Sequence, residues 1–193
     1  MTRYALDPYE LRDLALQHVG KPVPQIAADL EHDLVAKYGN LIQTDMPWVL
    51  TPAGFVMYQV KMVFARRNEY LGLMGVPVPS TGHTGRHPVT YYDTILSGAS
   101  RNASATDLVA TDVKAGDFLV TPPWEAFTAN IDDHIFFLEY CRGPLATIMP
   151  FGLANFVFGT LDLKSAGQIM RTNATLNWRS RGVPTPYGDD REV

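Results

Sequence analysis

The sequence predicts an α+β fold in which a small antiparallel β-barrel, or jelly roll, is flanked by N-terminal and C-terminal helices. Helix start and stop signals recur over residues 1–75 and helical patterning returns after Pro144, whereas the stretch between them breaks into short β-rich runs separated by Gly, Pro, Asn and Asp. The 193 residues contain no internal repeat and no long linker, so we expect a single domain over residues 1–193.

Residues 1–75 are predicted to form the helical N-terminal part. Asp7 followed by Pro8 is a helix N-cap with proline in the first turn, and Gly20 stands where a glycine would end that helix. A second helix is expected from about Gln25 to Lys37, where apolar residues recur at helical spacing.

A third, longer helix is predicted from Thr51 to about Met74. Thr51 precedes a proline, which repeats the cap-plus-proline signal, and Gly75 with Pro77 would end the helix. We expect an apolar stripe on this helix to face the core, formed by Val56, Val60, Val63 and Phe64.

The β-barrel is predicted over residues 77–141. The segment from Lys114 to Asp117 has the composition of a tight turn between two strands. The expected strands are Val89–Leu96, Asp107–Val113, Asp117–Thr121, Ala126–Ala129 and Ile135–Tyr140.

Helices are predicted to return over residues 144–178, and the polar tail over 179–193, rich in Pro and Gly, is expected to be flexible. No charged residue lies between Arg142 and Asp162, and a run of that length could span a membrane. Prolines and glycines interrupt the run, so we expect a buried or membrane-lying helix rather than a spanning one.

Composition and motifs exclude several classes of protein. Lys and Arg number 16 against 20 Asp and Glu, and the net charge of −4 argues against a nucleic-acid binder. Cys141 is the only cysteine, so neither an intrachain disulfide nor a cysteine-based metal site is possible. No nucleotide-binding glycine motif and no GxSxG elbow occurs, and we expect a small-molecule partner without a cofactor.

His83 and His87 are candidate metal ligands, four residues apart. They lie in GHTGRH, where the glycines indicate a loop rather than a helix that would bring the two rings together. No third ligand is evident, so the sequence predicts no metal site and assigns these histidines to hydrogen bonding within the loop.

The chain start, Met1–Asp13, has no apolar core of signal-peptide length. We expect a cytoplasmic protein with peripheral membrane contact at most. We also expect it to purify without detergent as a homo-oligomer that covers part of its apolar surface.

Two carboxylates stand inside predicted strands, where acidic residues are depleted. The period of two places Asp93 on one face with Tyr91 and Ile95, and Glu139 on one face with Phe137. Both acids could therefore point into the barrel and share a proton, since repulsion and burial would raise at least one pKa. The alternative is that one acid faces solvent or pairs with an arginine, either Arg86 or Arg142.

Three motifs occur in a fixed order: GHTGRH…YYDTILSG, then LEYCRG, then MPFGLANFVFGTLDL. With them the chain resembles the family of fungal sterol C8–C7 isomerases and sigma-one receptors, from about Leu14 to about Ile169. The resemblance implies a cupin-like β-barrel with helices at both ends, in agreement with the pattern of the sequence. It also implies a trimer.

The resemblance implies roles for three residues. In the family, a glutamate on a late barrel strand binds the cationic amine of ligands, and an aspartate on an earlier strand hydrogen-bonds to it. By motif these are similar to Glu139 and Asp93, and Tyr70 in NEYLGL is similar to the tyrosine that steadies the glutamate. We expect the substrate pocket to be lined by Tyr70, Met74, Tyr91, Ile95, Phe137, Ile148, Met149 and Gly152.

A protonated carboxyl in a dry pocket can protonate an alkene, and a carboxylate beside it can stabilise the resulting cation. Asp93 is assigned the proton and Glu139 the charge, although the order could be reversed in a coupled pair. The leading hypothesis is an acid/base isomerase or rearrangement enzyme that acts through a carbocation on a hydrophobic isoprenoid, sterol-like or polycyclic substrate. The alternatives are a protonation-initiated cyclase, a non-enzymatic binder of hydrophobic amines or sterols, and a structural oligomer with a vestigial cavity.

Overall fold

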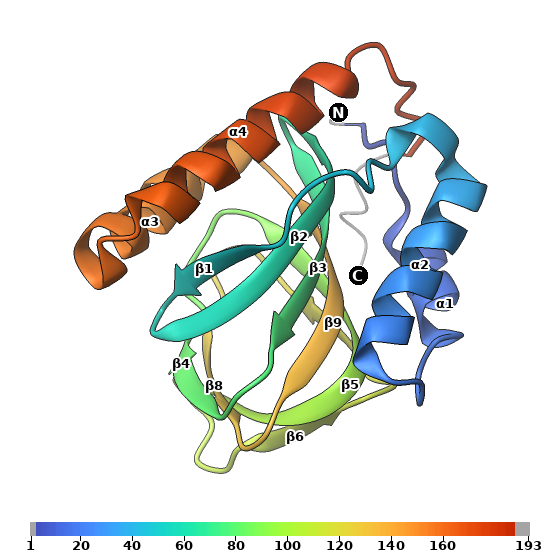
Figure 1. The fold of residues 1–193 in the computed structure, drawn as a ribbon. Helices are drawn as coiled ribbons and strands as arrows, with labels where there is room; N and C mark the ends of the chain where they lie inside the picture. Colours follow the sequence, from blue (N-terminus) through green and yellow to red (C-terminus); the bar gives the residue numbers. More distant parts are fainter. Residues whose placement is uncertain (1–2, 188–193) are drawn as a thin grey trace.

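A computed structural model describes residues 3–187 and shows a β-barrel flanked by helices (Figure 1). Helices α1 (Pro8–Leu16) and α2 (Val23–Tyr38) precede the barrel, and the short helix η1 (Gly39–Leu41) follows them. The predicted cap is confirmed, because the Asp7 carboxylate accepts hydrogen bonds from the backbone N–H groups of Tyr9 and Glu10 at 2.9 and 3.0 Å.

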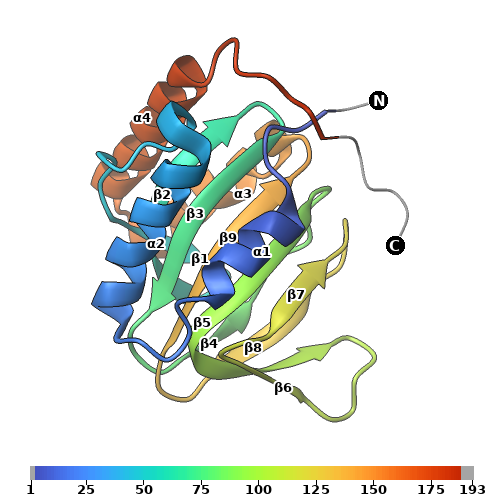
Figure 2. The same ribbon diagram turned by 90° about the vertical axis from the view of Figure 1, so that its right-hand side faces the viewer.

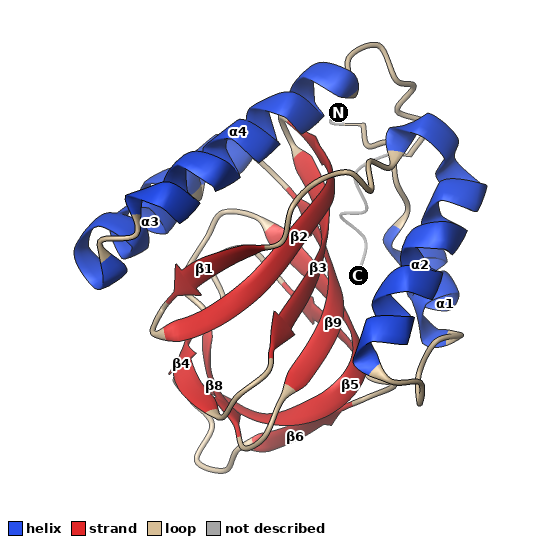
Figure 3. Ribbon diagram, in the orientation of Figure 1, coloured by secondary structure: helices blue, strands red, loops and turns tan. Residues whose placement is uncertain are grey.

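The barrel is one antiparallel sheet with the strand order β1-β2-β3-β9-β5-β8-β4, and β6 and β7 both pair with β5 (Figure 3). The long strand β5 pairs with β9 and β7 through its first half and with β6 and β8 through its second half. The bounds are β1 Val49–Ala53, β2 Val56–Arg66, β3 Glu69–Val76, β4 Ser80–His83, β5 Thr90–Ser104, β6 Thr111–Lys114, β7 Phe118–Thr121, β8 Phe127–Ile131 and β9 Ile135–Arg142.

The two ends of this strand order meet where the β1–β2 turn touches β4. The backbone N–H of His83 donates to the carbonyl of Gly54 at 2.8 Å. The approach is close enough to require glycine on both sides, since a Cβ at Gly82 would lie 2.3 Å from the Gly54 carbonyl oxygen and 2.5 Å from Val56 Cγ2. This contact nearly closes the barrel.

Replacing Gly82 by Ala should therefore destabilise the protein by about 2 kcal/mol, because the added methyl group overlaps backbone that cannot move without opening the barrel. Gly167 offers a matched control, since it is exposed in a helix and a Cβ there meets nothing within 4 Å. Gly167→Ala should stabilise by about 0.5–1 kcal/mol. Denaturant unfolding measures both, and a Gly82→Ala variant as stable as the natural chain would contradict this account of closure.

The central strands bury both of their faces. On β9, Phe136, Leu138 and Tyr140 point outward into a core shared with α1 and α2, while Phe137 and Glu139 point into the barrel. Figure 2 shows α1 and α2 lying over the outer face of β3, β9 and β5. The N-terminal helices thus form the second layer of the fold and leave the barrel interior free for a cavity.

A buried polar cluster fixes the N-terminal segment to the outer face. The Glu69 carboxylate accepts a hydrogen bond from the Ala5 N–H at 2.8 Å and another from the Tyr140 hydroxyl at 2.7 Å. The Arg142 guanidinium donates to the Leu6 carbonyl at 2.7 Å. Because buried charges need such partners, this cluster ties the chain start to β3 and β9.

The C-terminal part covers the side of the barrel formed by β1 and β2 (Figure 1). It consists of η2 (Leu145–Thr147), α3 (Met149–Ala154), the π-helical η3 (Asn155–Thr160) and α4 (Leu163–Arg179). Leu176 of α4 joins the interior core, and the Ser180 hydroxyl donates to the Ala65 carbonyl at 2.9 Å. None of the described helices is both long and apolar enough to cross a membrane.

The predicted helix from Thr51 to about Met74 is wrong. This segment forms the end of β1, all of β2 and most of β3, so the helical N-terminal part ends near residue 41 rather than 75, and the barrel begins at Val49 rather than at residue 77. The physical reason is burial on both faces of β3 and of the second half of β2, where apolar residues follow one another without the alternation that marks a half-exposed strand.

Four of the other predicted strands occur, with ends shifted by one or two residues and with β5 continuing to Ser104. Of the predicted strand Asp107–Val113 only residues 111–113 lie in a strand, and β4 was not predicted. The Lys114–Asp117 turn lies between β6 and β7. The part of the predicted flexible tail that the structure describes makes contacts with the rest of the fold: the Tyr187 backbone forms a bridge with Tyr4, and the Val183 carbonyl accepts a hydrogen bond from Arg66 at 3.0 Å. Residues 188–193 of that tail lie outside the described residues.

Candidate functional site

The barrel encloses a cavity of about 270 Å³, near the lower end of the range for small-molecule sites. Its walls come from the interior faces of the strands, and the C-terminal helices add residues such as Phe151, Phe156 and Ile169. Most of the lining is aliphatic or aromatic. No Lys or Arg occurs among these lining residues, and burial lowers the pKa of the lining His87, so at neutral pH no cationic side chain of the wall neutralises an acid inside the cavity.

Asp93 and Glu139 lie side by side on this wall. Asp93 is on β5 and Glu139 is on β9, and the two residues are direct partners in the antiparallel register. Side chains of direct partners project to the same face about 5 Å apart at Cβ. The strand pairing therefore places two carboxyl groups together in an apolar cavity.

Burial controls the ionisation of the pair. It raises the pKa of Asp93 well above the usual range, and the charge on Glu139 raises it further. Burial also raises the pKa of Glu139 to about 7, although a hydrogen bond from the Tyr70 hydroxyl to Glu139 Oε1 favours the charged form. At neutral pH the pair therefore holds more than one proton and fewer than two, and Asp93 is the more fully protonated of the two carboxyl groups.

One atom of the pair has an unmet hydrogen-bonding capacity. Asp93 Oδ1 is buried and has no hydrogen-bond partner within the described residues. Such an orphan atom is rare in folded proteins and costs free energy. A carboxyl oxygen of this kind can act on a bound molecule without first breaking a protein contact.

The alternative pairings with arginine are wrong. The Arg86 guanidinium donates to the Trp124 carbonyl at 2.7 Å. Arg142 lies on the outer face of the sheet, where it donates to the Leu6 carbonyl. Both predicted acids consequently face the cavity without an arginine partner.

The other ionisable groups near the pair stay neutral. Burial is the largest cause that raises the pKa values of the Tyr58, Tyr70 and Tyr91 hydroxyls, and nearby carboxylate charge adds to it. The same two causes raise the pKa of the Cys141 thiol well above its ordinary value. The negative charge inside the cavity at neutral pH is thus carried by the carboxyl pair, since the third lining acid, Glu125, is exposed.

All ten residues that the sequence assigned to the site line this one cavity. Tyr70 and Met74 are on β3, and the lining faces of β5 and β9 supply five others. The remaining three come from the segment after the barrel, namely Ile148, Met149 and Gly152. The structure brings the residues together, and their roles stay predictions.

The sequence analysis missed several lining residues on β2, because that strand was taken for a helix. A signal was present: in VMYQVKM the buried or half-buried Val56, Tyr58, Val60 and Met62 alternate with more exposed neighbours. Tyr58 packs edge-on against Phe137, with ring centroids 6.4 Å apart. Further lining residues that were not predicted are Leu119, Ile169 and Asn173.

The histidines of the GHTGRH loop hold the chain locally. His83 Nδ1 accepts a hydrogen bond from the Gly85 N–H at 2.9 Å, and His87 packs against Phe151 with ring centroids 4.8 Å apart. Across residues 3–187, no group of three or more His, Cys, Asp or Glu side chains is arranged to hold a metal ion.

Comparison with solved structures finds partial likenesses to cupin-type proteins. A predicted oxalate decarboxylase from Thermotoga maritima aligns with 53% of this chain and 97% of its own, at a TM-score of 0.44 and 14% identity. An RmlC-like cupin from Shewanella frigidimarina aligns with 54% of this chain and 94% of its own, at a TM-score of 0.42 and 14% identity.

Comparison with known sequences identifies the family. Residues 1–177 match the family described as ERG2 and Sigma1 receptor like protein. The erg2 homolog of Dictyostelium discoideum is 28% identical, over 82% of this chain and 68% of its own. The sigma non-opioid intracellular receptor 1 of Gallus gallus is 30% identical, over 83% and 73%, and the C-8 sterol isomerase of Mycosarcoma maydis is 32% identical, over 66% and 54%. The chain belongs to the family of ERG2 and Sigma1 receptor like proteins.

Proposed function

We propose that the protein is an acid/base isomerase that moves a carbon–carbon double bond in a hydrophobic isoprenoid, sterol-like or polycyclic substrate. The observation that carries the proposal is the pairing of Asp93 with Glu139 across β5 and β9 inside an apolar cavity. The similarity to C-8 sterol isomerases supports the reaction class.

The reaction needs one proton to enter and one to leave. The protonated Asp93 carboxyl gives its proton to one alkene carbon, which leaves a carbocation on the neighbouring carbon. The Glu139 carboxylate stabilises that cation and then takes a proton from an adjacent carbon, so that the double bond reforms one position away. A proton passes back from Glu139 to Asp93, and the pair returns to its starting state.

Tyr70 and the cavity wall make this chemistry feasible. The Tyr70 hydroxyl donates to Glu139, which keeps the charge on Glu139 and leaves the proton on Asp93. Apolar walls exclude water, which would otherwise trap the cation as an alcohol.

A second function, non-enzymatic binding of hydrophobic amines or sterols, is favoured by a separate observation. The cavity holds a net negative charge, and its wall has no Lys or Arg and one histidine, His87, whose pKa burial lowers, so it would hold an organic cation as well as a transient carbocation. Relatives named sigma non-opioid receptors support this alternative. A protonation-initiated cyclase would use the same first step and differ only in the fate of the cation.

Incubation with a lipid extract in D₂O, followed by mass spectrometry, tests the enzymatic function. We expect deuterium to enter an alkene product without a change in unsaturation, because the proton delivered by Asp93 exchanges with solvent. Loss of a double bond with ring closure would identify the cyclase. If no compound in the lipid extract takes up deuterium and the protein binds amines tightly, the result would favour the non-enzymatic binder.

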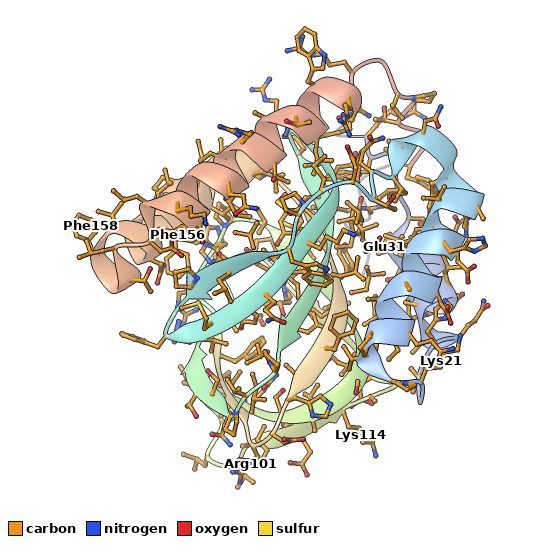
Figure 4. The ribbon with its side chains drawn as sticks, viewed as in Figure 1. Lys21, Glu31, Arg101, Lys114, Phe156 and Phe158 are labelled. Carbon is orange, nitrogen blue, oxygen red and sulfur yellow. The ribbon has the colours of Figure 1, made fainter. Side chains whose placement is uncertain are left out.

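We also propose that the junction between η3 and α4 contacts a membrane surface or another copy of the chain. The family resemblance implies a trimer. Phe158, which projects away from the barrel in Figure 4, is 87% exposed, and the nearby Leu161 is 77% exposed. Phe158→Asp should reduce sedimentation with phospholipid vesicles or dissociate the oligomer. Unchanged sedimentation and unchanged mass in solution would contradict this contact.

A further inference from the structure

Two polar side chains, Ser100 and Asn102, line the cavity on the second half of β5. A β-bulge between Ile95 and Ser97 shifts the alternation of β5 by one residue, so that Ser100 and Asn102 point into the cavity. Arg101, which lies between them, points outward, and its side chain is 55% exposed. Figure 4 shows Arg101 at the lower end of the barrel. Ser100 is only 6% exposed, so its hydroxyl belongs to the interior.

The wall around these side chains is apolar. Ser100 is the register partner of Val113 on β6, and Asn102 is the partner of Ala129 on β8. Val113 and Ala129 also line the cavity, as does Ile131. An amide and a hydroxyl in such surroundings cost free energy unless hydrogen bonds compensate them.

The two side chains satisfy each other only in part. The Ser100 hydroxyl donates to Asn102 Oδ1 at 3.0 Å. Within residues 3–187 the Asn102 amide N–H groups donate to no other group, and Ser100 Oγ retains lone pairs that can accept. The pair thus presents both a donor and an acceptor to a bound molecule.

The pair is remote from the carboxyl groups. Asp93 pairs with Glu139 near the middle of β9, whereas β5 has already passed the first residue of β9 when it reaches Ser100. Gly98 is the register partner of Ile135, which lies four residues along β9 from Glu139, a separation of roughly 13 Å in an extended strand, and Ser100 lies beyond Gly98. A molecule that touches both places must be elongated.

We propose that Ser100 and Asn102 form a polar subsite for a hydroxyl or carbonyl oxygen at the end of the substrate remote from the reacting double bond. The inference rests on the proposed function, because it places the double bond at the carboxyl pair. A hydroxyl is preferred to a carbonyl, since it can accept from the Asn102 amide and donate to Ser100 Oγ, whereas a carbonyl can only accept. The subsite fixes which end of an elongated substrate enters first, and hence which double bond meets Asp93.

Binding of simple probes to the full chain tests the subsite. One set is N,N-dimethylalkylamines with octyl, decyl, dodecyl and tetradecyl chains, and the matched set carries a hydroxyl at the far end of each chain. We expect the hydroxyl to strengthen binding at one chain length, where it reaches the subsite, and to weaken binding at the others. Asn102→Leu should reduce affinity for that hydroxylated amine about tenfold and leave the methyl-ended amine unchanged. Ser100→Ala should act in the same direction if Asn102→Leu folds poorly.

Arg101→Gln is the matched control, because Arg101 lies between the two residues but points outward, and it should change neither affinity. Binding of 1-dodecanol, which has no cationic group, distinguishes failure of the subsite from failure of cation recognition at Glu139. Equal affinity of the natural chain and both subsite variants for 1-dodecanol would overturn the subsite, whether or not amines bind. Suppose instead that the two subsite variants bind 1-dodecanol more weakly than the natural chain does, and that the natural chain binds amines no more tightly than alcohols. That result would support the subsite and contradict cation recognition at Glu139.

Discussion

Glu139→Gln should abolish turnover and the binding of cationic amines while the fold stays intact. The amide is nearly the same size and can still accept the hydrogen bond from Tyr70, but it can neither stabilise a cation nor take up a proton. Removing a positioned acid or base commonly costs about 10²–10⁴-fold in rate. Product analysis and calorimetry on the purified variant measure the two losses.

The same variant should be more stable than the natural chain at alkaline pH. The pKa of Glu139 is raised to about 7, so the stability linked to its neutral form is present below the unfolded pKa of 4.5 and is lost as the pH rises through 7. The loss amounts to about 3 kcal/mol at about 1.4 kcal/mol for each pKa unit. Denaturant unfolding at about pH 8 should show the difference, which should shrink towards pH 4.

Glu125→Gln is the matched control, because Glu125 also lines the cavity but is exposed at its edge. It should leave turnover, amine affinity and the pH dependence of stability unchanged. Normal activity in Glu139→Gln, or equal losses in both variants, would refute the role given to Glu139.

A tertiary amine with bulky apolar arms should bind at neutral pH at least about tenfold more tightly than its neutral carbon analogue, a difference of roughly 1.4 kcal/mol. The amine is held by the net negative charge of the pair, and no Lys or Arg in the wall competes with it. Affinity should fall as the pH drops below about 7, because Glu139 then takes up a proton that the cation must displace.

Calorimetry over a pH series checks both parts of this prediction. The carbon analogue serves as the internal control, since its affinity should change little with pH. Equal affinity of the two compounds at neutral pH would mean that Glu139 does not face the ligand.

The strands that carry the carboxyl pair could be predicted because they are short β-rich runs bounded by Gly, Pro, Asn and Asp. In Val89–Leu96 and Ile135–Tyr140, the two-residue repeat of a strand places Asp93 and Glu139 on the same faces as large apolar residues, and the structure puts both acids in the cavity wall. What the alternation could not give was the register that makes the two residues direct partners, since pairing depends on contacts between distant strands.

The strands β2 and β3 could not be recognised by their apolar content. In β3 and the second half of β2, the outer faces pack in the core shared with α1 and α2 and the inner faces line the cavity and the inner core, so apolar residues follow one another without a clear period. Only residues 56–62 of β2 alternate. Thr51 and Pro52 then gave a false helix start, although they lie in the edge strand β1, where proline is tolerated. The cavity residues of β2 were lost with the strand.

The polar pair on β5 was hidden for a different reason. Ser100 and Asn102 lie beyond the end of the predicted strand, in a stretch of small polar residues that is typical of a loop. Only the continuation of β5 through its bulge, and its pairing with β6 and β8, turns these side chains inward.

The sharing of protons between Asp93 and Glu139 can be measured most directly from the ¹³C shifts of their carboxyl carbons as a function of pH, with Asp93→Asn and Glu139→Gln to assign the signals. We expect the Asp93 carboxyl to remain protonated through neutral pH and the Glu139 carboxyl to titrate near pH 7. Two carboxyl groups that are both ionised at about pH 5 would contradict the paired acid and base on which the proposed reaction depends.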